Sequence, residues 1–167
     1  MSNEGWEAIE KIIESLTIFN DGARGTQTPR NQSRIIIAET VLRLPESVRE
    51  KVVKDAVFIT IGGAYGCVLL MVHSELKSEG QLIKTSEGLV WVKIEAQIII
   101  LNFAEMEKDE LDEENMRTTV AHEIAQFILG HHRSVGRGRV REKEADDLIE
   151  KWGFKRAYQN YERFARS

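Results

Sequence analysis

The chain has 167 residues, of which 42% are hydrophobic and 30% charged, and its formal net charge at pH 7 is -4. This length suits one domain with its own core, and the composition excludes a disordered or fibrous chain. The negative charge argues against a general nucleic-acid-binding protein, which usually has a basic balance.

The first third of the chain is expected to be helical. Apolar residues recur at helical spacing over 5–19, with Glu and Lys between them, and predict an amphipathic helix. Residues 20–33 are rich in Gly, Thr, Arg and Asn and predict a loop. The range 34–44 is compatible with a strand or a helix, and we favour a helix. Pro45 then begins a short helix at 45–55.

Two pairs of strands are expected in the middle of the chain. The ranges 57–61 and 67–72 are apolar and rich in β-branched residues, and a glycine turn separates them. The ranges 89–94 and 97–103 have the same character. We therefore expect a sheet of about four strands, mostly antiparallel.

The last third is predicted to be helical again. The acidic run at 105–114 is typical of a solvated helix entry or a loop. Gly130 predicts the end of the next helix, and an arginine-rich loop at 133–141 follows it. Further helices are expected at about 141–152 and 157–166. The apolar face of the helix before Gly130 comprises Met116, Val120, Ile124, Phe127 and Ile128.

The helix before Gly130 carries the candidate chemistry. In the pattern His-Glu-x-x-His, two imidazoles one helical turn apart hold zinc, and the Glu polarises the zinc-activated water. Here His122 and Glu123 are followed by Gln126 where the second His would stand. Zinc prefers nitrogen and sulfur donors to a neutral amide oxygen, so we expect zinc binding to be weakened or lost.

The surroundings of this pair resemble a known family. Residues 118–131, with their Leu-Gly-His ending, are similar to the signature helix of the ImmA/IrrE zinc metallopeptidases. A strand at 98–102 precedes that helix, and Glu142-Lys143-Glu144-Ala145-Asp146 looks like the family's Glu-x-x-Ala-Asn/Asp element. The resemblance covers roughly the C-terminal half. It implies that Glu142 is the third zinc ligand, with Glu144 as the alternative.

Two more histidines are further candidate ligands. His132 lies ten residues after His122, the spacing at which metzincins place a third ligand beyond a glycine turn, although the glycine is displaced here by one position. A simpler explanation for His131 and His132 is that they favour the negative end of the helix. Taken singly, the other candidates also have ordinary explanations: His122 as a core histidine, Glu123 as a surface acid and Glu142 as a charge at a helix N-terminus.

The resemblance implies a fold as well. We expect an α+β, zincin-like metallopeptidase domain, in which a small, mostly antiparallel sheet packs against the motif helix and additional helices. A single domain would cover 1–167, with a helix and loop at 1–33 and the motif-bearing core at about 89–155.

Two functions are compatible with these residues. The first is peptide-bond hydrolysis by a zinc-activated water with Glu123 as general base, impaired in this form by Gln126. Family members act on helix-turn-helix repressors, so the implied partner is a protein or peptide of that kind, with no direct nucleic-acid binding. The alternative is a catalytically inactive pseudo-peptidase that binds a protein at its sheet edge. A substitution introduced at Gln126 to disable an enzyme would give the same sequence.

The cellular location is expected to be cytoplasmic. Cys67 is the only cysteine, which rules out an intramolecular disulfide and favours a reducing compartment. The N-terminus lacks the basic flank and apolar stretch of a signal peptide. The longest apolar runs, such as 66–72, are far shorter than the ~20 residues that span a bilayer, so no membrane partner is expected.

Overall fold

A computed structural model gives the fold of this chain. It describes residues 3–20, 30–61, 81–85, 88–92, 97–131 and 138–157. Within these ranges the chain alternates helices and strands, which confirms a mixed α and β architecture. The elements are α1 (Asn3–Ser15), β1 (Thr17–Asn20), α2 (Arg30–Arg43), α3 (Glu46–Asp55), β2 (Ala56–Ile61), β3 (Gln81–Thr85), β4 (Gly88–Val92), β5 (Gln97–Asn102), α4 (Phe103–Lys108), α5 (Glu113–Leu129) and α6 (Arg139–Lys151).

The three-stranded sheet is parallel, so the expectation of a mostly antiparallel sheet is wrong for it. Its strand order is β1-β2-β5, and both neighbouring pairs run in the same direction. Parallel neighbours need a long crossover, and here α2 and α3 lie between β1 and β2 along the chain. The segment 62–96 separates β2 from β5. The antiparallel pair β3–β4 forms a separate two-stranded sheet.

The first helix is shorter than expected. It ends at Ser15, whose hydroxyl donates to the carbonyl oxygen of Ile12 at 2.8 Å. The residues that follow, Thr17 to Asn20, pair with β2 as a strand. Thr17 and Ile18 are β-branched, and β-branched residues favour strands over helices, which explains why the helix does not continue to residue 19.

Several other expectations are confirmed. The helices favoured at 34–44 and 45–55 correspond to α2 and α3, and the strand at 57–61 lies in β2. Helix α2 already begins at Arg30, so the expectation that the loop extends to residue 33 is wrong. Strands β4 and β5 match the last two expected strands, whereas β3 and α4 were not expected. The expected strand at 67–72 lies outside the described residues, and so does the expected last helix beyond Ala157.

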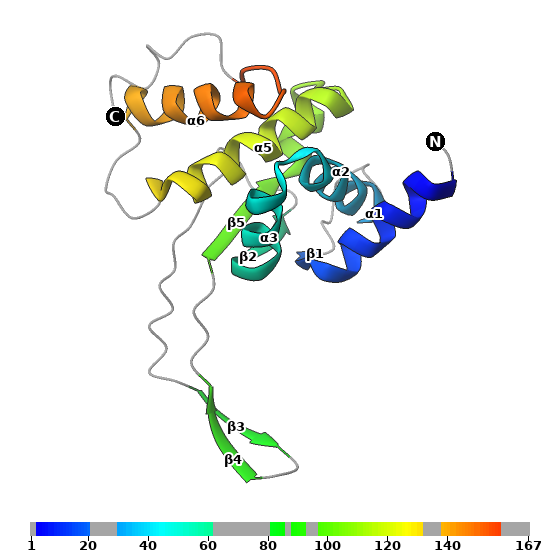
Figure 1. The fold of residues 1–167 in the computed structure, drawn as a ribbon, viewed down its shortest axis with the longest axis vertical. Coiled ribbons are helices and arrows are strands. Elements are labelled where there is room, and N and C mark those ends of the chain that lie inside the picture. The colour runs from blue at the N-terminus through cyan, green and yellow to red at the C-terminus, as the bar shows by residue number, and fades with distance from the viewer. Residues whose placement is uncertain are drawn as a thin grey trace.

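Helix α5 is the centre of the fold. It packs against α2, α6 and β5, and Figure 1 shows it passing between α6 and the sheet. Its N-terminus is capped by Asp112, whose carboxylate accepts the N–H of Asn115 at 2.7 Å, and it ends at Gly130 with φ 70°. Its buried side chains lie on nearly every side of the helix. They are Met116, Thr118, Thr119, Val120, Ala121, His122, Glu123, Ile124, Ala125 and Phe127.

The core lies between α5, α2 and one face of the sheet. Phe58 of β2 and Ile99 and Leu101 of β5 are fully buried, as are Ile37 of α2 and Ile124 of α5. Burying a side chain of this size stabilises the fold by about 1.5–3 kcal/mol relative to leaving it in water. Packing on three sides therefore fixes the position of α5, and with it the residues that α5 carries.

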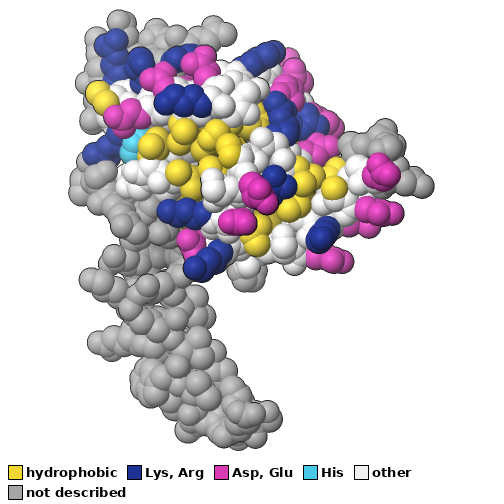
Figure 2. Space-filling view, in the orientation of Figure 1, with side chains coloured by type: hydrophobic (Ala, Val, Ile, Leu, Met, Phe, Trp, Pro, Cys, Tyr) yellow, Lys and Arg dark blue, Asp and Glu magenta, His cyan; other side chains and the backbone are white. Residues whose placement is uncertain are grey.

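On the described part of the surface in Figure 2, acidic and basic side chains lie beside one another around a band of hydrophobic side chains. Such a mixture agrees with the small net charge of the chain. Of the helices that the structure describes, none combines the length and the apolar character that crossing a membrane requires.

Candidate functional site

The packing of α5 on α6 brings two pairs of polar residues together. His122 and Gln126 are four residues apart on α5, and Glu142 and Asp146 are four residues apart on α6. Residues at this spacing lie on the same face of a helix, one turn apart. The two pairs face each other where the helices pack, so residues distant in the sequence form one cluster. We call these four residues the buried cluster.

Three polar atoms of the buried cluster lie at equal distances from one another. Glu142 Oε2 is 3.0 Å from His122 Nε2 and 3.0 Å from Gln126 Nε2. Gln126 Nε2 is in turn 3.0 Å from His122 Nε2. The amide of Gln126 therefore donates to the Glu142 carboxylate, and its nitrogen also lies next to the His122 imidazole. The residues that the sequence motif and the resemblance single out as ligands converge on one point.

The other imidazole nitrogen of His122 is held by Asp146. Its Nδ1–H donates to Asp146 Oδ1 at 2.6 Å, and both side chains have no exposure to solvent. A carboxylate in this position fixes the tautomer and the direction of a histidine, which is the usual arrangement behind metal-bound imidazoles. Sequence reasoning gave Asp146 no role. The available signals were its place at the end of the Glu-x-x-Ala-Asn/Asp element and its spacing, one helical turn after Glu142.

Two carboxylates flank His122 and change its ionisation. Burial by itself lowers the pKa of His122, but the hydrogen bonds to Asp146 and Glu142, together with the negative charges of Glu123 and Asp146, outweigh burial and raise the pKa to about 9. The metal-free imidazole is therefore protonated at neutral pH, with Nε2–H facing Glu142. A metal ion that binds His122 has to displace this proton.

Glu123 lies beside the buried cluster and is also inside the protein. Its side chain is only 1% exposed, although it follows His122 directly on α5. The expectation that it could be an ordinary surface acid is therefore wrong. A buried carboxylate is costly for a fold, and its charge acts on the neighbouring imidazole. Glu123 thus belongs to the same electrostatic site as His122.

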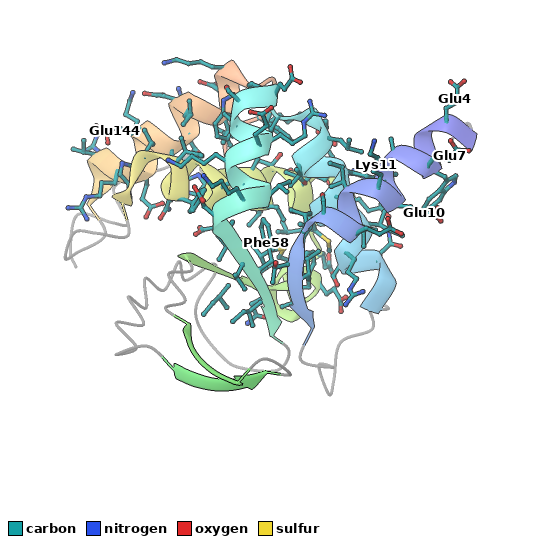
Figure 3. All side chains as sticks on the ribbon, turned by 60° about the horizontal axis from the view of Figure 1, so that its bottom comes forward. Glu4, Glu7, Glu10, Lys11, Phe58 and Glu144 are labelled. Carbon is teal, nitrogen blue, oxygen red and sulfur yellow. The ribbon has the colours of Figure 1, made fainter. Side chains whose placement is uncertain are left out.

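The remaining candidates lie apart from this cluster. Glu144 is on the opposite, exposed side of α6 from Glu142, and Figure 3 shows it on the outer surface near the start of that helix. Its Oε2 pairs with His131 Nε2 at 3.0 Å. Burial lowers the pKa of His131 below its ordinary value, and the charge of Glu144 only partly opposes this. His132 lies outside the described residues.

The buried cluster fits a zinc ion in part. Zinc bonds to nitrogen and oxygen of about 2.0–2.2 Å place neighbouring ligands of a tetrahedral site about 3.3 Å apart, close to the 3.0 Å separations here. His122 and Glu142 therefore have suitable atoms in suitable places. Gln126 does not fit, because its donor nitrogen faces the other two groups and its neutral amide oxygen would be a weak ligand.

A complete set of ligands is not formed in the described ranges. In that part of the chain, no three His, Cys, Asp or Glu side chains are grouped so that they could hold a metal ion. A catalytic zinc needs about three protein ligands. The described residues thus offer two strong ligands, one of them oriented by Asp146, and an amide in the third position.

Comparison with known proteins adds no relative. No protein-family model matches the chain, and no curated protein or solved structure is similar enough to it to count as a match. The functional inference therefore depends on the residues of the buried cluster and Glu123, and on their geometry.

Proposed function

We propose that this chain carries the site of a zinc-dependent, zincin-like peptidase of the ImmA/IrrE type, with peptide-bond hydrolysis impaired in this form by Gln126. One observation carries the proposal: Gln126 Nε2 lies 3.0 Å from both His122 Nε2 and Glu142 Oε2. The residue at the position of the missing ligand thus points at the two ligands that are retained. Helical spacing by itself brings Gln126 near His122, whereas its contact with Glu142 comes from the packing of α6 on α5.

The roles of the residues follow from their chemistry. His122 and Glu142 would hold the metal ion, and Asp146 directs the Nε2 atom of His122 toward it. Zinc, when bound, supplies the positive charge that acidifies water and polarises a peptide carbonyl. Glu123 would accept a proton from the attacking water and return it to the leaving amine. The expected substrate is a protein or peptide, of the repressor type that the resemblance implies.

The second candidate function is that of a catalytically inactive binding protein. It is favoured by the hydrogen bonds of Glu142, because this carboxylate accepts from Gln126 Nε2 and from the protonated Nε2 of His122 and is thus satisfied without a metal. A site completed by hydrogen bonds can keep the scaffold and its substrate surface after hydrolysis is lost. The two candidates differ in what restoring the ligand should do.

The test restores the missing ligand and asks for hydrolysis. Gln126→His is loaded with one equivalent of zinc and incubated with a complex peptide mixture, and new termini are read by mass spectrometry. The matched control is the same variant with Glu123→Gln, which keeps the ligands but lacks the base. We expect cleavage by the single variant and a rate lower by about 10²–10⁴-fold in the control.

The other outcomes separate the candidates. Zinc uptake by Gln126→His without any cleavage would favour the binding protein on a former peptidase scaffold. Equal cleavage by both variants would exclude Glu123 as the base. Failure of Gln126→His to bind zinc would contradict the peptidase proposal.

A further inference from the structure

The residues that follow α6 fold back along that helix. Trp152 ends the helix, and Gly153 has φ 86°, a left-handed conformation that residues with a side chain rarely adopt. The N–H of Phe154 then donates to the carbonyl oxygen of Ile149 at 3.0 Å, which reverses the chain. We call residues 152–157 the C-terminal turn.

The C-terminal turn is fixed both inside the protein and on its surface. Phe154 is buried in the core, and the guanidinium of Arg43 lies 4.1 Å from the centre of its ring. On the surface, Arg156 donates to Asp147 at 2.6 Å and to Glu150 at 2.7 Å, both on α6. These contacts hold the end of the turn against α6.

The turn ends on the buried cluster. The main-chain N–H of Ala157 donates to Asp146 Oδ1 at 3.1 Å. The same oxygen accepts Nδ1–H of His122 at 2.6 Å. Because Asp146 has no exposure, solvent does not compete for that oxygen. One buried atom therefore joins the C-terminal turn to the imidazole.

A main-chain donor restrains the carboxylate in a way that a mobile side chain does not. The position of the Ala157 N–H is set by the backbone of the turn, so it limits rotation of the Asp146 carboxylate about its Cβ–Cγ bond. The direction of the carboxylate sets the direction of the imidazole, because the bond to His122 is short and buried. The placement of Ala157 is thus passed on to His122.

We propose that the C-terminal turn is a positioning element of the site, in which the N–H of Ala157 orients Asp146 and Asp146 orients His122. Ala157 acts only through Asp146. The orientation of His122 does not depend on any metal, whereas its consequence for zinc affinity rests on the proposed peptidase function. The proposal adds a main-chain group, eleven residues after Asp146, to the residues that the site requires.

The first test uses the metal-free protein. Ala157→Pro removes the N–H, whereas Ala157→Gly also changes the side chain but keeps the N–H. NMR of protein labelled at its histidines reads the hydrogen-bonded Nδ1–H of His122. We expect this resonance to be unchanged in Ala157→Gly and to move upfield or broaden by exchange in Ala157→Pro. An unchanged resonance in folded Ala157→Pro would overturn the proposal.

Two further variants serve as a control and as a replacement if Ala157→Pro does not fold. Arg156→Ala keeps the main-chain N–H of Ala157 but removes the surface ion pairs of the turn. It should therefore move the His122 resonance in the same direction as Ala157→Pro does, but by less. If Ala157→Pro does not fold, an α-hydroxy acid at position 157 replaces the N–H by an ester oxygen without restricting φ. A merely structural turn would lower the unfolding temperature in these variants and leave the His122 resonance of the folded protein unchanged, which would also overturn the proposal.

The second test measures zinc affinity in the Gln126→His background. Mutating a residue that hydrogen-bonds to a metal ligand typically lowers metal affinity by 10–100-fold. Ala157 acts on such a residue, Asp146, rather than on the ligand itself, so we expect zinc to bind about tenfold more weakly in Ala157→Pro than in Ala157→Gly. Equal affinities would overturn the coupling to the metal position. If the Gln126→His parent takes up no zinc, the proposed function fails, and the NMR result alone then decides whether the turn positions His122.

Discussion

Helix α5 carries two polar clusters that differ in their relation to solvent. Near its N-terminus, Arg117 pairs with Glu39 of α2 at 2.6 Å and with Glu113 and Glu114 of its own helix at 2.9 and 3.4 Å. The side chains of Arg117 and Glu39 are 16% and 14% exposed, and those of Glu113 and Glu114 are more exposed. Five residues later along the helix begins the buried cluster, in which His122 and Asp146 have no exposure.

The difference between the two clusters shows which polar groups serve the fold alone. The Arg117 cluster joins α2 to α5 with charges that are only partly buried, so they lose less contact with water than the fully buried His122 and Asp146. The buried cluster places an imidazole, an amide and two carboxylates in the core, where apolar residues of the same volume are often equally or more stabilising. The contact between α2 and α5 is therefore a sufficient reason for the Arg117 cluster. Stability alone does not account for the buried cluster, which indicates a chemical role.

The largest effect on stability is expected from His122→Ala in zinc-free buffer. It leaves two buried carboxylates, Glu142 and Asp146, without their cation, and breaking a buried pair from one side costs about 3–5 kcal/mol. Urea unfolding measures the change in the free energy of unfolding. Ile124→Val, a purely apolar change on the same helix, is the control and should cost about 0.5–1.5 kcal/mol. Equal losses would mean that the cluster matters only for its volume.

A smaller effect is expected from Arg117→Ala. It removes the cation that pairs with Glu39 at the interface between α2 and α5, and because both side chains keep some exposure to solvent we expect a loss of about 1–2 kcal/mol. The same measurement in 1 M salt, where charges are screened beyond about 3 Å, should show a smaller loss. A loss as large as that of His122→Ala, and insensitive to salt, would erase the distinction between the two clusters.

The smallest effect is expected at the N-terminal cap of α5. Asp112→Ala removes the carboxylate that accepts the N–H of Asn115, which should cost about 1 kcal/mol. Asp109→Ala, an exposed change in the preceding turn, is the matched control and should leave the urea midpoint nearly unchanged. A cost at Asp112 above that at Arg117 would show that helix formation, rather than the contact of α5 with α2, limits stability at this end.

The local elements of the fold were predictable from the sequence, but its topology was not. Helix α5 and strand β2 have apolar patterns that depend only on near neighbours along the chain. Strand β1 was hidden because Leu16 and Phe19 continue the helical spacing of the apolar residues in α1. Strand direction was missed because it depends on the connections between strands. The sequence of a short apolar strand such as 57–61 is compatible with a parallel or an antiparallel sheet.

Only those residues of the candidate site that belong to a recognisable sequence motif were predictable. His122, Glu123 and Gln126 stand in one helical motif, and the family resemblance added Glu142. Asp146 was missed as a functional residue, because its contact with His122 arises only from the packing of α6 on α5. The contact between Ala157 and Asp146 was hidden for a stronger reason, since a main-chain N–H leaves no trace in the amino-acid sequence.

The central claim is that the buried cluster is a zinc site with one ligand replaced, and zinc titration of three metal-free proteins tests it most directly. These are this chain, Gln126→His and Gln126→Leu, the last of which removes the amide without adding a ligand. Zinc sites with four ligands bind with about 10–16 kcal/mol, so one ligand is worth about 3 kcal/mol, or about a hundredfold in affinity. We predict one zinc per chain and about a hundredfold tighter binding for Gln126→His alone. Equal affinities in all three proteins, or no zinc in Gln126→His, would contradict the claim.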